Sequence, residues 1–150
     1  MTIRKIKIID DDGLREKLDS IYENSSHIKI AKWSLLLAEH IIEIAGINKN
    51  DYPPISEGFH INKLWQLGEM RMHDVRQAGF KIHQIARVQE DEIKKTAFRV
   101  IGQAIASGHM KEHGMVASDY AIKVINLMYP KNMDRVIEER KWQISELEKL

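Results

Sequence analysis

The chain has 150 residues, 43% hydrophobic and 30% charged, which is typical of one globular domain with a substantial core. Its formal net charge of +1 argues against a nucleic-acid binder and against a membrane-surface binder. Cysteine is absent, which excludes disulfides and thiolate metal sites, and no apolar run approaches the roughly 18 residues that span a bilayer, so we expect a cytoplasmic protein.

The N-terminal third predicts an arm followed by two helices. Residues 1–12 contain the weakly alternating stretch TIRKIKII, and we expect a short strand or a poorly ordered arm ahead of a single domain at 13–150. An Asp run precedes a helix over 13–23 and suits the positive end of its dipole. Ser25 or Ser26 then caps a long helix that ends at Gly46. Trp33 lies on the apolar stripe of this helix, which predicts a core position.

The middle of the chain contains the clearest predicted loop. Residues 46–57, GINKNDYPPISE, include Pro53 and Pro54, which we interpret as forbidding a helix. A short helix from about Phe59 to Leu67 is expected next, and an amphipathic pattern predicts another over 69–88.

The C-terminal part predicts three further helical segments. Asp91 opens a helix rich in small residues, residues 114–128 continue helically until Pro130, and a charged amphipathic helix covers 133–147. With short connections throughout, the sequence predicts an all-α single-domain bundle of about six or seven mostly antiparallel helices.

One motif suggests zinc. The stretch SGHMKEHG places His109 and His113 four residues apart with Glu112 between them, which spells the H-x-x-E-H signature of some metalloproteases. The two imidazoles share a helical face if a helix continues through the intervening residues. A zinc site needs a third protein ligand, for which His83, Asp119 and Glu112 are candidates. Only 37 residues follow His113, too few for such a protease domain. We therefore expect no cofactor, with zinc on the histidines as the alternative.

A second pattern predicts a polar stripe on the helix over 69–88. Arg76, Phe80, His83 and Arg87 fall on one face, and arginine forks of this kind hold anions or acidic side chains. If this helix packs beside the next one, His83 and His109 converge in one polar pocket. The alternative is a solvated face whose arginines pair with Asp74, Glu90 or Asp119.

Three further polar or aromatic residues are candidates for a functional or a structural role. Trp65 follows the proline loop and could seal a helix junction, and Trp142 either packs on the bundle or marks a contact surface. Asp119 enters a helix beside Tyr120, for which we expect a structural role.

Six stretches in register carry a resemblance: AKW at 31–33, LWQLGE at 64–69, RQAGFKIHQIAR at 76–87, AFRVIGQAIASGHMKEH at 97–113, SDYAIKV at 118–124 and ERKWQ at 139–143. Over about residues 28–147 their order and spacing resemble the bacterial Imm-5-like family of putative immunity proteins. The family pattern falls here on His83 with Arg87, on Gly102 to Gly108, on His109 with His113, and on Arg140 with Trp142–Gln143. The family's Asp-x-Arg-Pro-type turn is replaced by DYPPIS, which lacks the arginine.

The resemblance implies an all-α, non-enzymatic protein that binds and neutralises a cognate bacterial toxin. The residues that we select as candidates for binding a ligand or that partner are Arg76, His83, Arg87, His109, His113, Trp65, Asp119 and Trp142. The alternative is a small metal- or anion-binding helical enzyme that uses His83, His109 and His113. A third possibility is a homo-oligomer that pairs through the amphipathic helix at 132–148.

Overall fold

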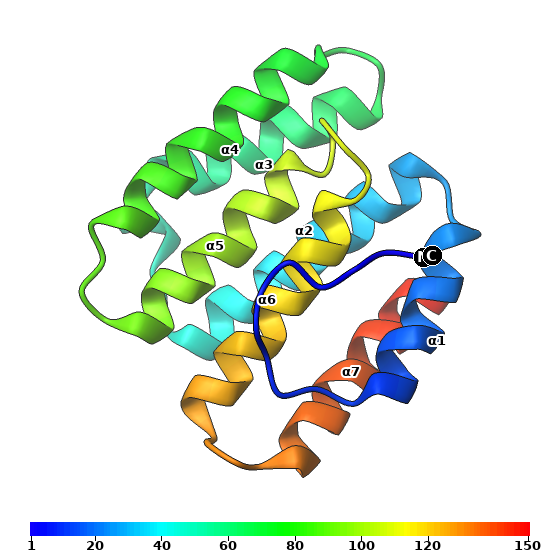
Figure 1. Ribbon diagram of the computed structural model, residues 1–150. Helices are drawn as coiled ribbons and strands as arrows, with labels where there is room; N and C mark the ends of the chain where they lie inside the picture. The colour runs from blue at the N-terminus through cyan, green and yellow to red at the C-terminus, as the bar shows by residue number, and fades with distance from the viewer.

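The computed structural model describes residues 1–150 and consists of seven α-helices with one short 3-10 helix and no β-strand (Figure 1). The prediction of an all-α fold is therefore confirmed. In chain order the elements are α1 (Asp12–Glu23), α2 (His27–Ala45), η1 (Lys49–Asp51), α3 (Pro53–Gln66), α4 (Met72–Arg87), α5 (Glu92–Ala106), α6 (His113–Met128) and α7 (Met133–Glu148).

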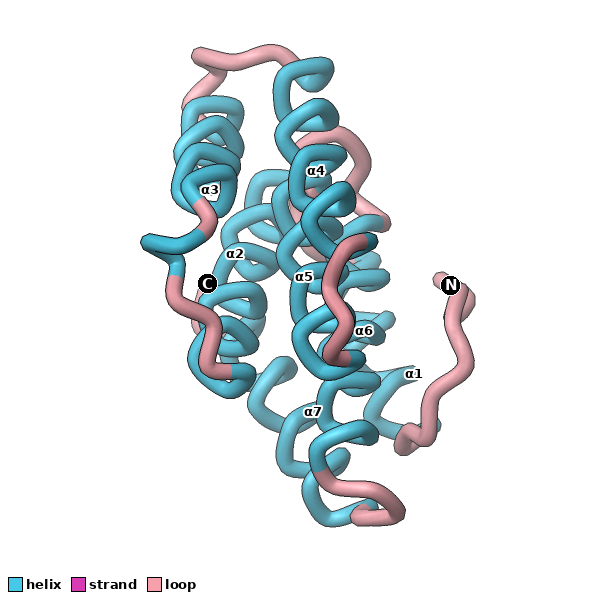
Figure 2. Tube along the Cα trace, turned by 90° about the vertical axis from the view of Figure 1, so that its left-hand side faces the viewer, coloured by secondary structure: helices cyan, strands magenta, loops and turns pink.

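The helices form two layers, and α2 belongs to the second of them. α4, α5 and α6 lie side by side in one layer, with α3 and α2 behind them, and α1 pairs with α7 at one end (Figures 1 and 2). α2 packs against both α5 and α6, so its apolar stripe is covered from several sides. Trp33 and Leu37 on this stripe are fully buried, which confirms the predicted core position of Trp33. None of the helices combines the length and hydropathy that crossing a membrane requires.

Local sequence signals determine the ends of α2 and the start of α5. The Ser26 side chain accepts a hydrogen bond from the Lys29 N–H, and Gly46 ends α2 in the left-handed conformation at φ 67°. Asp91 caps α5 by accepting from the Ile93 N–H. These boundaries agree with those predicted from the sequence.

The interpretation of the two prolines as helix-forbidding is wrong. Pro53 and Pro54 occupy the first two positions of α3, which therefore begins six residues before the predicted start at Phe59. An N–H at these positions has no partner within the helix, so its loss costs nothing, and the fixed φ of proline suits the first turn.

No helix continues through His109 and His113, so the condition under which their imidazoles would share a helical face is not met. α5 ends at Ala106 and α6 begins at His113. The Ile105 carbonyl accepts from Asn62 Nδ2 at 2.8 Å as well as from the Gly108 N–H at 3.5 Å, and the Ser107 carbonyl accepts from His27 Nε2 at 2.6 Å. Side chains of α3 and α2 therefore donate to carbonyl groups that a longer α5 would use.

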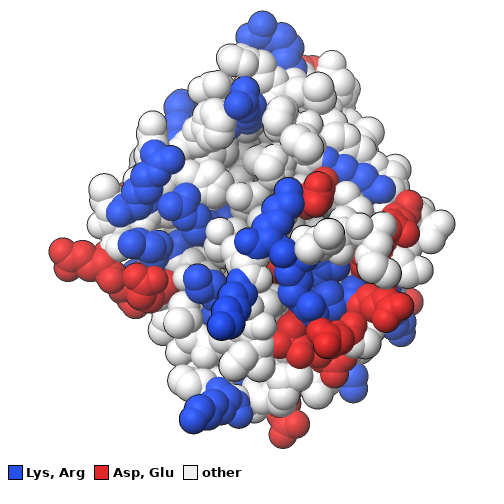
Figure 3. Space-filling view, in the orientation of Figure 1, with Lys and Arg blue, Asp and Glu red and all other residues white.

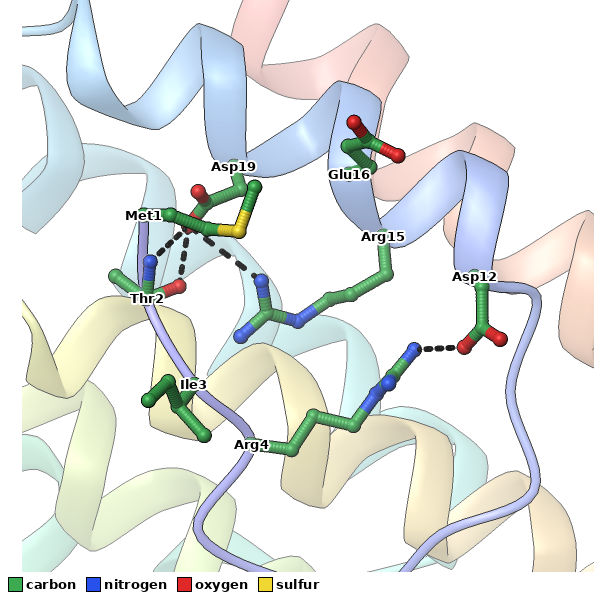
Figure 4. A pocket seen from close by; sticks show the side chains of 8 residues that line it. All are labelled: Met1, Thr2, Ile3, Arg4, Asp12, Arg15, Glu16 and Asp19. Carbon is green, nitrogen blue, oxygen red and sulfur yellow. Dashed lines mark hydrogen bonds and ion pairs between the residues drawn. The ribbon is translucent and has the colours of Figure 1, made fainter.

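The N-terminal arm lies across α6 and α1 in an extended conformation. Its odd-numbered residues are exposed and its even-numbered residues are partly buried, as the alternating sequence suggests. The Ile9 N–H donates to Asn126 Oδ1 at 2.9 Å, and Asn126 Nδ2 donates to the Ile9 carbonyl at 3.0 Å. Thr2 bonds Asp19 at the far end of the arm (Figure 4).

Arg140 of α7 joins this arm to the helices. Its side chain is fully buried, and each of its five N–H groups has an acceptor. Asp10 of the arm takes two of these hydrogen bonds, at 2.9 and 2.7 Å, and Asp119 of α6 takes one at 2.7 Å. Ser118 and Gln143 take the remaining two.

The charges around Arg140 extend into a network with two further arginines. Arg15 of α1 donates to both oxygens of Asp119, at 2.9 and 3.1 Å, and Arg4 donates to Asp10 at 3.0 Å. Burial raises the pKa of Asp10, but hydrogen bonding to Arg140 and the charges of Arg140 and Arg4 outweigh it and hold the pKa below its ordinary value. The Asp10 carboxylate therefore remains ionised beside the guanidinium groups of Arg140 and Arg4.

We expect Arg140→Gln to lower the free energy of unfolding by about 3–5 kcal/mol, because Asp10 and Asp119 would stay buried and each would keep only one of its two guanidinium partners. Urea unfolding measures this directly. Arg71→Gln is the matched control, since Arg71 pairs with Asp74 on the surface and its loss should cost less than about 1 kcal/mol. Equal costs for the two variants would contradict a supporting role for the buried network.

Candidate functional site

A pocket of about 360 Å³ opens between α4, α5 and the turn that leads into α6. It brings His83 of α4 together with His109 and His113, as expected if α4 packed beside α5. The residues that line it are Arg76, Gly79, Phe80, His83, Gln103, Ala106, His109, Met110 and His113.

His83 forms the inner side of this pocket in a neutral state. Its Nδ1 lies 2.9 Å from Arg99 Nη1, and because arginine can only donate, Nδ1 accepts and the ring proton resides on Nε2. Burial, followed by the charge of Arg99, lowers the pKa of His83 to about 4. The ring lies so close to Gly102 that a Cβ atom there would be 2.7 Å from it. The small residue of α5 therefore makes room for the imidazole.

His109 and His113 come from the turn and from the start of α6. Their rings stack with centroids 5.9 Å apart. His113 Nδ1 lies 2.7 Å from Gln103 Oε1, to which it donates. Burial, then the nearby His109 and Lys5, lower the pKa of His113, with Glu112 acting in the opposite direction. His109 Nδ1 is buried and has no hydrogen-bond partner, so the pocket contains one unused polar atom.

The rim of the pocket combines apolar and cationic groups. Phe80 is 44% exposed and Met110 is 48% exposed, and the Arg76 guanidinium lies 5.0 Å from the centre of the Phe80 ring. No Asp or Glu lines the pocket, and neither Arg76 nor Arg87 forms an ion pair. The ion pairs to Asp74, Glu90 or Asp119 that the alternative interpretation required are therefore not formed. The neutral imidazole of His83 beside the unpaired guanidinium group of Arg76 suits a carboxylate or another anion.

The other residues selected from the sequence lie elsewhere. Arg87 is exposed on α4 outside the pocket lining, and Asp119 belongs to the buried network around Arg140. Trp65 packs against His27 with ring centroids 4.6 Å apart, close to the turn at residues 107–108, so it seals a helix junction. Trp142 stacks on His40 at 3.7 Å.

Metal binding finds no assembled ligand set. No group of three or more His, Asp or Glu side chains is placed to hold a metal ion. Asp119, one of the suggested third ligands, is occupied by Arg15 and Arg140. Glu112 lies instead 3.6 Å from Lys5 of the arm.

The sequence analysis missed Arg99 and Gln103, which fix the orientations of His83 and His113. Both belong to α5, four residues apart, and so face the same side of that helix. The four-residue spacing is visible in the sequence, but the residues between them are mostly apolar, which indicates only the buried face of α5.

Another cavity lies between the arm and α1, with a volume of about 440 Å³ (Figure 4). Its arginines and aspartates already pair with one another: Arg4 bonds Asp12 at 2.8 Å, and Arg15 lies 3.5 Å from Asp19. Since its charges satisfy each other, it is a weaker candidate for a binding site than the histidine pocket.

Comparison with known proteins identifies the family. The family model described as Imm-5 like putative immunity protein matches residues 20–150. No curated protein and no solved structure matches the chain. The match covers α2 to α7 entirely, so the chain belongs to this family, and the resemblance seen in the sequence is confirmed.

The neutral state of His83 predicts a pH-dependent stability. The pKa of about 4 in the folded chain lies below the ordinary histidine value of 6.5, so the unfolded chain takes up a proton on His83 first as the pH falls. Stability is fully present above pH 6.5 and decreases toward pH 4. His83→Gln lacks this loss, so from pH 7.5 to 5.0 the wild type should lose about 1–2 kcal/mol more than the variant in urea unfolding, allowing for partial exposure.

The same variant at pH 7.5 is the control, since His83 is neutral there in both states. A difference between wild type and variant that does not change with pH would contradict the burial of a neutral imidazole.

Proposed function

We propose that this member of the Imm-5 like family acts in the bacterial cytoplasm by binding a cognate toxin and blocking it, without catalysing a reaction. The observation that carries the proposal is the family match over residues 20–150. A stable bundle with one basic, partly apolar pocket on its surface is compatible with a protein that works by contact.

We place the toxin contact around the histidine pocket, on the outer face of α4. Met72, Arg76 and Phe80 follow one another at four-residue spacing, so they share a helical face. Phe80 and Met72 are 44% and 51% exposed, which is high for large apolar side chains. Arginine and aromatic side chains surrounded by apolar contacts are the usual anchors of protein interfaces.

The charge of this region favours an acidic surface on the partner. Figure 3 shows Lys and Arg side chains over α4 and α5, whereas Asp and Glu gather beside the arm and at the left edge, where α4 connects to α5. Arg76 and Arg87 form no ion pair within the chain, and Arg99 donates a hydrogen bond to His83 rather than to a carboxylate. An acidic group of the toxin would supply the missing partners and accelerate association.

A small anion-binding enzyme remains the second candidate, because three histidines converge in the same pocket. The two functions differ in what occupies the pocket: a side chain of a large partner in one case, and a free anion that is chemically changed in the other. A partner that covers Arg76 and Phe80 fits only the first.

The test uses the toxin encoded beside this gene. Co-expression of the chain should restore growth to cells that produce the toxin, and the purified proteins should form a complex in isothermal titration calorimetry. Arg76→Ala and Phe80→Ala should each weaken that complex roughly 30-fold, the effect of losing an interface anchor of about 2 kcal/mol.

Arg71→Ala is the control, because Arg71 is an exposed arginine just before α4 that already pairs with Asp74. Failure of the wild type to bind or to rescue growth would refute the proposed function. Binding that is equally tight in all three variants would refute the α4 surface while leaving the function intact.

A further inference from the structure

A second pocket, of about 310 Å³, lies between α2, α6 and α7 and contains the other unsatisfied atom of the molecule. Only two buried side-chain polar atoms lack a hydrogen-bond partner: His109 Nδ1 and Glu139 Oε2. The Glu139 side chain is 3% exposed and lines this second pocket. A buried carboxylate oxygen without a donor is costly, so its presence beside a cavity calls for a ligand.

The carboxylate is held in a fixed position. Glu139 Oε1 accepts a hydrogen bond from His40 Nε2 at 2.6 Å, and the His40 ring stacks on Trp142 with centroids 3.7 Å apart and planes at 16°. Glu139 Oε1 is therefore bonded to His40, whose ring is held by stacking on the Trp142 indole, and Glu139 Oε2 has no donor.

The rest of the lining favours a flat cation. Glu138 adds a second carboxylate against the one arginine of the lining, Arg135, and Trp142 adds an aromatic ring of the kind on which guanidinium groups stack. The chain shows this preference itself, since the Arg135 guanidinium lies 4.3 Å from the centre of the Tyr129 ring. Arg135 forms no ion pair with Glu139, so the unused oxygen is not satisfied from within the chain.

The surroundings of the pocket are acidic as well. On the other side of the His40–Trp142 pair lies a hollow lined by Glu39 and Glu43, with Lys49 as its one lysine, and Lys49 already pairs with Glu39 at 3.1 Å. The field at this end of α2 and α7 therefore attracts positive charge, unlike the field at the histidine pocket.

We propose that this second pocket binds a guanidinium group, with Glu139 Oε2 as the acceptor of its N–H donors and Trp142 as the aromatic wall. The group comes either from a small free guanidinium compound or from an arginine side chain of a protein. The proposal does not depend on toxin binding, because it rests on the unsatisfied carboxylate and on the acidic and aromatic lining of this pocket.

The test follows the Trp142 indole N–H in NMR spectra of the full chain during titration with ethylguanidinium chloride, at ionic strength held constant with NaCl. Ethylurea, which has the same shape but no charge, is the matched control ligand. We expect a saturable shift with ethylguanidinium and none with ethylurea. A blocked Gly-Arg-Gly peptide that binds more tightly than ethylguanidinium identifies a protein side chain as the source, and equal binding identifies a free compound.

The variants separate this site from general attraction to an acidic surface. Glu139→Gln should weaken binding at least about tenfold, because a charge-assisted hydrogen bond is lost. Glu148→Gln, at an exposed position of α7, should leave binding unchanged. If Glu139→Gln does not fold, Glu138→Gln at the exposed edge of the pocket should still weaken binding about threefold. A linear, non-saturable shift, an equal response to ethylurea, or undiminished binding in the Glu138 and Glu139 variants would overturn the proposal.

Discussion

The guanidinium of Arg140 is the interaction on which the assembly of the arm, α1, α6 and α7 depends. It is fully buried, and its five N–H groups reach the arm, α6 and its own helix. Burying a single arginine would be prohibitive, but here each donor has an acceptor and two carboxylates offset the charge. The Gln143 side-chain oxygen accepts from Arg140, and the Gln143 backbone carbonyl accepts from Trp33 Nε1 at 2.9 Å. The network therefore extends to α2. Elements far apart in the chain are thereby joined at one point.

This network occupies one part of the molecule and leaves another free for binding. The stretches that carry the family resemblance divide accordingly: SDYAIKV and ERKWQ supply Ser118, Asp119, Arg140 and Gln143 to the network, whereas RQAGFKIHQIAR and AFRVIGQAIASGHMKEH supply the histidine pocket. In the network every donor of Arg140 is used. The two pockets, by contrast, each keep one polar atom without a partner, His109 Nδ1 in one and Glu139 Oε2 in the other. Satisfied polar groups hold the bundle together, and unsatisfied ones mark where other molecules would bind.

Much of the fold was predictable because local signals determine it. Ser26, Gly46 and Asp91 mark helix ends through hydrogen bonds and backbone conformation within a few residues. The start of α3 and the end of α5 differ from the prediction because position within the helix and contacts from other helices decide them. Proline inside a helix would break it, but Pro53 occupies the first position of α3, where it is tolerated. α5 stops short of His109, where Asn62 and His27 of two other helices donate to the carbonyl groups of Ile105 and Ser107. The role of Arg140 could not be predicted, because its partners Asp10 and Asp119 lie 130 and 21 residues away. The sequence of a charged helix does not indicate which arginine faces inward.

We expect the outer face of α4 and the adjoining histidine pocket to be the surface that contacts the toxin. Hydrogen–deuterium exchange of the chain, alone and in complex with the toxin encoded beside its gene, locates that contact. Exchange should slow on binding in peptides that cover residues 72–84 and 107–113, because these line the pocket or its rim. Unchanged exchange in both segments, with protection confined to the arm and α1, would contradict it.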